Sequence, residues 1–146
     1  MFFAQPTLAF AHLRGSLRGG GRCVFVCWRT PRDNDWVMTP LSAARQALGI
    51  KPERTDPHAP GPFAFADDER LKVILRDAGF EQIELRRFDA PVYLGETPRT
   101  AAENAVRVGP TGRLLREVGE ELGPVVTAAV TQALEAHAAP GGQVSL

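Results

Sequence analysis

The pattern of apolar and polar residues along the chain predicts a mixed α/β fold, organised around one apolar run from Cys23 to Trp28. Before this run, Phe10, Leu13 and Leu17 recur at helical spacing, so a helix is expected from about Pro6 to Arg18. The run itself is rich in β-branched and aromatic residues and does not alternate with polar ones. Such a run is typical of a strand that is buried on both faces of a parallel sheet. We therefore expect Cys23–Trp28 to be the central strand of a sheet covered by helices.

Three glycines separate this helix from this strand. Glycine-rich loops that bind phosphate run from a strand into a helix, whose first N–H groups then point at the anion. The direction here is the reverse, from a helix into a strand. Gly19 and Gly20 are therefore expected to supply the left-handed residue that ends a helix, not a phosphate loop.

The remaining pattern predicts further helices and one more strand. Asp67 is expected to cap a helix that Gly79 ends. Ile83 and Leu85 alternate with polar residues, which predicts a strand with one solvent face. The proline-rich stretch 29–62 is too long for an ordinary connection and is expected to form a lid or binding loop. The helices are expected at about Pro40–Leu48, Glu69–Ala78, Pro98–Val108, Leu114–Val118 and Pro124–Ala138.

Length and composition narrow the class of protein. The 146 residues suffice for one domain, and 17 basic residues balance 17 acidic ones, which argues against nucleic acid or an anionic membrane as a partner. No apolar stretch is long enough to span a bilayer, and the N-terminus lacks the basic lead of a secretory signal, so a cytoplasmic protein is expected. Cys23 and Cys27 would lie about 13 Å apart on one strand, too far for a disulfide. The three histidines show no metal-ligand spacing with them, so no metal site is expected.

Several segments, taken in order, resemble the second half of bacterial class I (Rossmann-like) S-adenosylmethionine-dependent methyltransferases. The resemblance covers nearly the whole chain. Each matching segment alone is common among proteins, but their occurrence in this order along one chain is specific. It implies a partial Rossmann-like sheet of two or three strands with flanking helices, a helical lid insertion at about 29–62 and C-terminal helices at about 97–139. Residues 1–146 would then be the C-terminal portion of one methyltransferase domain. The matching segments are Met1–Pro6, Leu17–Arg22, Val24–Trp28, Pro60–Asp67, Leu75–Phe80 and Val108–Pro110 with Leu114–Leu115.

The resemblance implies S-adenosylmethionine as cofactor, although most of the site that binds it is missing from this sequence. In the family, a glycine-rich loop and an acidic residue at a strand end hold the cofactor, and both would precede Met1. The family also closes with an antiparallel strand, which would begin near Val144. This chain would then supply the substrate-side half of the enzyme and, by itself, bind the cofactor weakly or not at all.

Three aromatic residues are the candidates for binding the methyl acceptor, expected to be a small molecule. Ligands of open α/β sheets bind beyond the carboxyl ends of the strands, where Phe3, Trp28 and Trp36 are expected. Aromatic faces attract a sulfonium cation and exclude water. Phe2, at the same strand end as Phe3, is the expected cofactor contact. Phe3 and Trp28 are equally compatible with ordinary core packing, whereas Trp36 lies among polar residues, which favours a pocket or lid.

Catalytic residues are not identified by the sequence. Asp33, Asp35 and His58 lie in the predicted lid and are candidates for a general base, but such residues are more common as solvated loop positions. The alternative function is a catalytically inactive, truncated paralogue that acts as a binding or oligomerisation module. A sheet cut at its edge exposes apolar residues, among them Phe2 and Val24, so the expected partner is the missing N-terminal half or a second copy.

Overall fold

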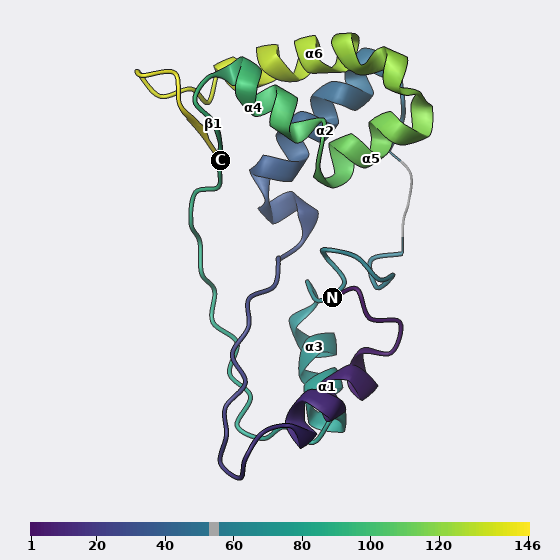
Figure 1. Cartoon of the computed structure of the whole chain (residues 1–146), viewed down its shortest axis with the longest axis vertical. Helices are drawn as coiled ribbons and strands as arrows, with labels where there is room; N and C mark the ends of the chain where they lie inside the picture. The colour runs from purple at the N-terminus through teal and green to yellow at the C-terminus, as the bar shows by residue number, and fades with distance from the viewer. Residues whose placement is uncertain (53–55) are drawn as a thin grey trace. The chain divides into compact units, whose positions relative to one another are not determined.

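The structure is a computed structural model that describes residues 1–52 and 56–146. Within these residues the chain is a mixed α/β protein that divides into two compact units (Figure 1). The first unit comprises Met1–Asp33 and Thr55–Phe88, and the second comprises Asn34–Arg54 and Asp89–Leu146. Each unit has its own core of buried apolar residues.

In the first unit, helix α1 (Pro6–Gly15) packs against helix α3 (Asp68–Asp77). Phe10 lies at the centre of this core, with its ring contacting the rings of Phe3, Phe25, Phe65 and Phe80 at centroid distances of 5.2–6.4 Å. Leu71, Ile74 and Leu75 of α3 complete the buried cluster. In α3 the face that the apolar spacing selects is the buried face, whereas in α1 only Phe10 of the expected stripe is buried. Leu13 is 46% exposed, and Leu17 lies beyond the end of the helix and is 37% exposed, so this part of the prediction is wrong.

The ends of α3 agree with the signals in the sequence. The Oδ1 atom of Asp67 accepts hydrogen bonds from the backbone N–H groups of Glu69 and Arg70, each at 3.0 Å. Two amides that have no partner inside the helix are satisfied in this way. Gly79 has φ +86°, a left-handed conformation in which the chain reverses after the helix. Both predictions are confirmed, and Gly20 also adopts the left-handed conformation, with φ +71°, although α1 already ends at Gly15.

The segment from Cys23 to Trp28 is not a strand, so the prediction of a buried central strand is wrong for this structure. Within the described residues, no backbone hydrogen bond joins Arg22–Cys27 to another segment. Val24 is 85% exposed and Val26 is 79% exposed. Only alternate side chains face the helices, because Phe25 packs on Phe10 while the Cys27 Sγ lies 3.8 Å from the carbonyl oxygen of Phe65. One face is covered and the other is open, and no neighbouring strand completes a ladder.

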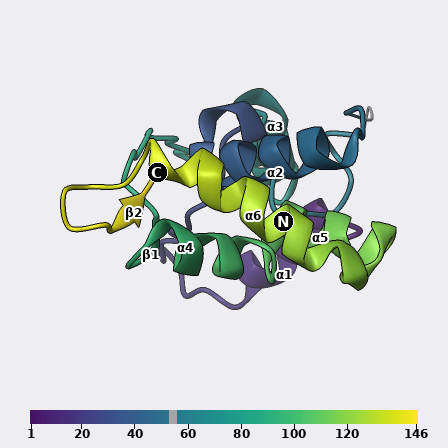
Figure 2. The same cartoon turned by 90° about the horizontal axis from the view of Figure 1, so that it is seen from above.

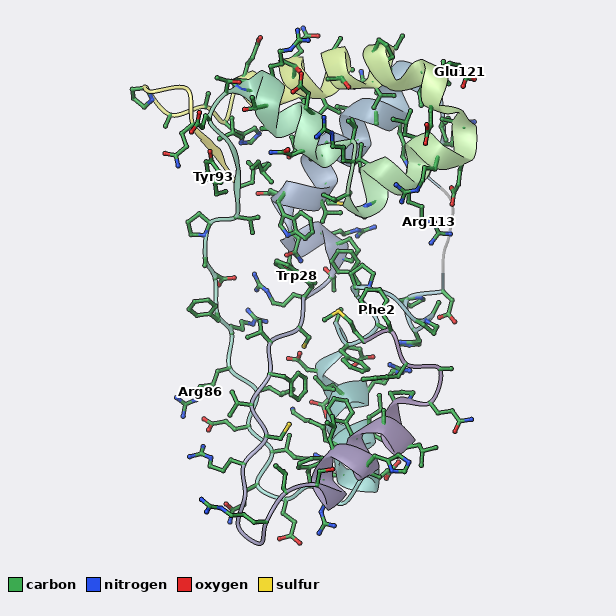
Figure 3. The ribbon with its side chains drawn as sticks, viewed as in Figure 1. Phe2, Trp28, Arg86, Tyr93, Arg113 and Glu121 are labelled. Atoms are coloured by element: carbon green, nitrogen blue, oxygen red, sulfur yellow. The ribbon has the colours of Figure 1, made fainter. Side chains whose placement is uncertain are left out.

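A second extended segment, residues 82–88, behaves in the same way. Ile83 and Leu85 pack on the α1/α3 core, whereas Glu84 and Arg86 form an exposed ion pair at 2.7 Å. Arg86 projects away from α1 and α3 (Figure 3). The predicted alternation is therefore present, but the predicted strand pairing is not, because this segment also lacks a ladder partner among the described residues.

Electrostatic contacts link the two extended segments at both ends. The pKa of Glu84 is lowered by its hydrogen bond from Arg86 and, more weakly, by Arg22. The pKa of Asp33 is lowered first by the Thr30 hydroxyl and then by nearby arginines that include Arg87. Arg22 thus lies within electrostatic reach of Glu84, and Arg87 within reach of Asp33, which follows the first segment. Both segments run in the same direction in the first unit.

The second unit is a small helical bundle. Helix α6 (Gly123–Glu135) packs against both α2 (Asp35–Leu48) and α4 (Pro98–Ala105), and α5 (Gly109–Val118) contacts α2 (Figure 2). A short 3₁₀ turn at Glu120–Leu122 precedes α6. Another, at Pro31–Asp33, precedes α2 in the sequence and belongs to the first unit. The core consists of small and branched side chains, so the helix axes can approach closely. The buried members are Ala44, Ala101, Ala102, Leu115, Val126, Val130, Leu134 and Val144.

A short antiparallel sheet closes this unit. Strand β1 (Tyr93–Gly95) pairs with β2 (Val144–Ser145), and Val92 exchanges two backbone hydrogen bonds with Leu146, at 2.6 and 3.1 Å. Strand β2 therefore belongs to a separate two-stranded sheet of the second unit. None of the helices in the described ranges has the length and apolar character needed to cross a bilayer.

Candidate functional site

The best candidate site is a cavity of about 230 Å³ in the second unit, next to Trp36. Its wall is formed by the first turn of α2, by β1 with the residue before it, and by the junction of α4 and α5. Most of the lining is apolar, which is usual for a small-molecule site. The lining residues are Trp36, Val37, Val92, Tyr93, Leu94, Asn104, Ala105, Val108, Pro110 and Thr111.

The indole of Trp36 is held in place from two sides. Its Nε1 atom donates a hydrogen bond to the Oδ1 atom of Asn34 at 3.2 Å, and Asn34 is itself buried. A methyl group on Gly109 would lie 3.8 Å from the Trp36 ring, an ordinary packing distance, so the ring lies directly beside the start of α5. Gly109 has φ +67°, which turns the chain into Pro110 and so directs α5 past the ring. Trp36 is therefore positioned by both neighbouring elements.

Three polar side chains complete the wall. The Asn104 amide donates to the carbonyl oxygen of Leu94 at 2.8 Å and so ties α4 to β1. Thr111, in the first turn of α5, is 3% exposed. Tyr93 is half-exposed at the edge of the cavity and is labelled in Figure 3. Hydroxyl and amide groups of this kind can orient a ligand without carrying charge.

No carboxylate, histidine or cysteine is among the described lining residues of this cavity. The wall can therefore exclude water, stack a ring or a cation against Trp36 and position a ligand. Tyr93, at the edge of the cavity, is the one side chain of the described lining that could serve as a general acid or base. The arrangement is suited to binding and orientation.

A larger and more open groove of about 760 Å³ follows α4 and α6. Charged residues of both signs line it, and Arg99 and Glu103 form an ion pair at 3.0 Å on its surface. It is a weaker candidate, because it is open to solvent and is lined by charged residues at the surface of two helices.

The predicted aromatic residues are divided between the two units. Phe2, Phe3 and Trp28 belong to the first unit and Trp36 to the second, so each is described within its own unit. Phe3 packs edge-on against Phe10 at 6.4 Å and remains half-exposed. Phe2, the expected cofactor contact, is 71% exposed, and Trp28 is 36% exposed (Figure 3). Phe3 thus contributes to the packing around Phe10 without being buried. Of the four residues, Trp36 is the one that lines the cavity.

The candidate general bases lie at the surface. Asp33 accepts a hydrogen bond from the Thr30 hydroxyl at 2.7 Å, which is the main reason its pKa is lowered. A lowered pKa makes a carboxylate a weaker base. Asp35 and His58 are exposed, and the backbone N–H of His58 donates to the Asp56 carboxylate at 2.8 Å. These contacts agree with ordinary turn positions.

Sequence reasoning missed Asn34, Tyr93, Asn104 and Thr111. Asn34 could have been predicted from the sequence, because it lies two residues before Trp36 and its amide oxygen can accept a hydrogen bond from the indole N–H. The other three reach the cavity through the packing of α4, α5 and β1, for which the sequence carries no local signal. Among the described residues, no cluster of three or more His, Cys, Asp or Glu side chains has the arrangement of a metal site.

Comparison with known proteins adds no relative. No family model matches this sequence, and neither the curated proteins nor the solved structures contain a significant match.

Proposed function

We propose that this chain contributes the substrate-side part of an S-adenosylmethionine-dependent methyltransferase and that the Trp36 cavity binds a small methyl acceptor. The observation that carries the proposal is the composition of the cavity wall, which is mostly apolar and aromatic and has no carboxylate, histidine, cysteine, lysine or arginine among the described lining residues. Transfer of a methyl group from a sulfonium depends chiefly on alignment in a water-poor site and needs little acid–base chemistry. The collinear resemblance to methyltransferases supplies the reaction class.

The first unit supports the same proposal. Two helices cover one face of two extended segments that run in the same direction, in the order helix, extended segment, helix, extended segment. This order is that of one half of a layered α/β sheet. The Rossmann-like assignment of the unit is part of the proposal.

The residues of this chain do not fit the cofactor by themselves. The sequence contains neither a Gly-x-Gly loop leading from a strand into a helix nor an acidic strand end, and Phe2 is largely exposed. Methyl transfer therefore requires a complementing polypeptide that carries those elements. Such a polypeptide is expected to be encoded directly upstream.

The proposal is tested by calorimetric titration with S-adenosylmethionine. The chain alone is expected to show no micromolar binding, and co-expression with the upstream-encoded segment is expected to restore it. In the reconstituted pair, labelled methyl groups from the cofactor should pass to a compound in a small-molecule extract. Micromolar binding by the chain alone would show that the cofactor site has been assigned to the wrong segment, and no binding by the pair would reject the proposal.

Trp36 has a sharper test in the same system. Trp36→Ala should reduce labelled product at least tenfold and leave the dissociation constant of the cofactor unchanged, because Trp36 is assigned to the acceptor. Val125→Ala, at a half-exposed position of α6 outside the cavity, is the matched control and should change neither. Equal product from Trp36→Ala and the control would remove this cavity from the proposal.

The second candidate function is a binding or oligomerisation module without catalysis. It is favoured by one observation, the exposure of Val24, Val26 and Phe88 on the first unit. Exposed apolar side chains that gather on one surface mark sites of protein contact.

A further inference from the structure

Thr111 is a buried polar side chain whose hydrogen-bonding groups the fold does not use. It is 3% exposed, lies in the first turn of α5 and lines the Trp36 cavity. Neither its hydroxyl nor its backbone N–H makes a hydrogen bond with a described residue. Buried hydroxyl groups normally have a partner, because burying one without a partner costs free energy. The surface that Thr111 still exposes belongs to the cavity wall, so a bound ligand can supply the missing partner.

The N-terminal end of α5 makes this part of the cavity favourable for a negative charge. The first turn of α5 contains no acidic side chain, and Val108, which precedes the helix, provides no side-chain cap. The unpaired N–H groups at the start of a helix, together with the helix dipole, attract anions. Val108, Pro110 and Thr111 all line the cavity, so this end of the helix opens into it.

The rest of the cavity fits an aromatic ring. The indole of Trp36, held by Asn34, offers an aromatic surface against which a ring can pack. An apolar cavity of about 150 Å³ is enough to bind benzene. The volume of about 230 Å³ therefore holds one ring with one or two small substituents.

The charges around the cavity favour a ligand with a single negative charge. No acidic side chain is among the described lining residues, and Asp35, next to Trp36 in α2, is exposed and lies outside the lining. No lysine or arginine is among them either. A phosphate carries nearly two charges and is usually bound with the help of such a cation, whereas one helix end and one hydroxyl suit a carboxylate.

We propose that the Trp36 cavity recognises a small aromatic carboxylate, with the carboxylate at Thr111 and the ring against Trp36. The identification of this ligand as the methyl acceptor rests on the proposed function, whereas its binding requires neither the cofactor nor a complementing polypeptide. The carboxylate accepts hydrogen bonds from the hydroxyl and the backbone N–H of Thr111. Hydrogen bonds to a charged acceptor are stronger than those to a neutral one. A primary amide of the same shape binds less well, because it is uncharged and its NH₂ group cannot accept from these donors.

Binding is tested by titrating the isotope-labelled full chain with para-hydroxybenzoate near neutral pH and recording NMR spectra. The signals of the Thr111 amide and the Trp36 indole N–H should shift together and saturate. The dissociation constant of para-hydroxybenzoate should be at least tenfold lower than that of para-hydroxybenzamide, which has the same shape without the charge. Acetate, which has the charge without the ring, should also bind at least tenfold more weakly.

Substitutions at Thr111 test the carboxylate contact. Thr111→Val removes the hydroxyl and keeps the shape, so it should raise the dissociation constant of para-hydroxybenzoate at least fivefold, and Thr111→Ser should retain most of the affinity. Thr127→Val, on α6 outside this cavity, is the matched control and should change nothing. Because the hydroxyl has no partner among the described residues, Thr111→Val should not lower the melting temperature of the free chain. A clear loss of thermal stability would show that the hydroxyl has a structural role.

The result of this titration separates the inference from the proposed function. Equal affinity for the carboxylate and the amide, or shifts that do not include Thr111, would overturn the carboxylate site. Methyl transfer by the reconstituted pair to a compound without a carboxylate would also overturn it and leave the proposed function intact. Selective carboxylate binding by a chain whose reconstituted pair transfers no methyl group would support the site and reject the proposed function.

Discussion

Replacement of Leu134 by alanine should destabilise the second unit and leave the first largely unchanged. Leu134 lies in α6 with 0% of its surface exposed and belongs to the core that includes Val126 and Val130. The first unit has a separate core around Phe10 and Leu71. Mutations in cores that share no contacts should act independently.

The magnitude follows from the atoms removed. Leu134→Ala deletes three buried carbon atoms, and at about 0.8 kcal/mol per buried methylene the lost transfer free energy is about 2.4 kcal/mol. A cavity that does not collapse adds to this cost, and measured Leu→Ala changes in cores reach about 5 kcal/mol. The expected loss is therefore about 2–5 kcal/mol, a large part of the roughly 5–15 kcal/mol by which domains are stable.

Denaturant unfolding measures the loss of free energy, and hydrogen exchange read by mass spectrometry locates it. Peptides from α2, α4 and α6 should lose protection, and those from α1 and α3 should retain it. Val125→Ala, at a half-exposed site in the same helix, should change stability by less than about 0.5 kcal/mol. Equal loss of protection in both units would refute the reasoning, because it would show that the two cores unfold as one.

Three further predictions concern single sites. Cys27 should react more slowly with iodoacetamide near neutral pH than the exposed Cys23. Burial, and to a lesser extent Asp68, raises the pKa of the Cys27 thiol and so lowers the fraction of reactive thiolate. Equal rates of modification in peptide mapping would contradict this. Gly95→Ala should destabilise the contact of β1 with α4, because its Cβ would lie 2.6 Å from the backbone nitrogen of Ala101, whereas Gly141→Ala, with nothing within 4 Å, should be close to neutral in thermal unfolding. The pKa of Asp67 is held below its usual 3.8 chiefly by the hydrogen bond from the backbone amide of Arg70. The stabilisation of α3 by this carboxylate is therefore present above pH 3.8 and is lost as pH falls through the lower pKa of the folded state. Helicity measured during an acid titration should fall accordingly, Asp67→Asn should remove this pH-dependent loss, and a titration curve that the variant leaves unchanged would count against the cap.

Local signals in the sequence predicted the helices well. Asp67 and Gly79 bound α3 because capping depends on atoms a few residues away. Helix α2 begins five residues earlier than the expected Pro40, since Val37, Leu41 and Ala44 continue the buried stripe through that proline. Burial of this stripe outweighs the cost of a proline inside the helix.

Contacts between distant segments were predicted less well. The run Cys23–Trp28 has the composition of a buried strand, but its burial depends on neighbours that no local pattern specifies. Only Phe25 and Cys27 find apolar partners in the first unit. Trp36 was selected because an indole among polar residues is unusual, and it does line the cavity, whereas the contributions of Asn104 and Thr111 depend on helix packing.

The chain order of the two units has a consequence for synthesis on the ribosome. Each unit is assembled from two separate stretches of the chain, and helix α2 is made long before α6, against which it packs. Its apolar stripe of Val37, Leu41 and Ala44 therefore leaves the exit tunnel without its partner and must wait until α6 has been translated. A pause in translation before Val126 would prolong this exposure, so codon usage in the stretch between α2 and α6 should influence the yield of folded protein.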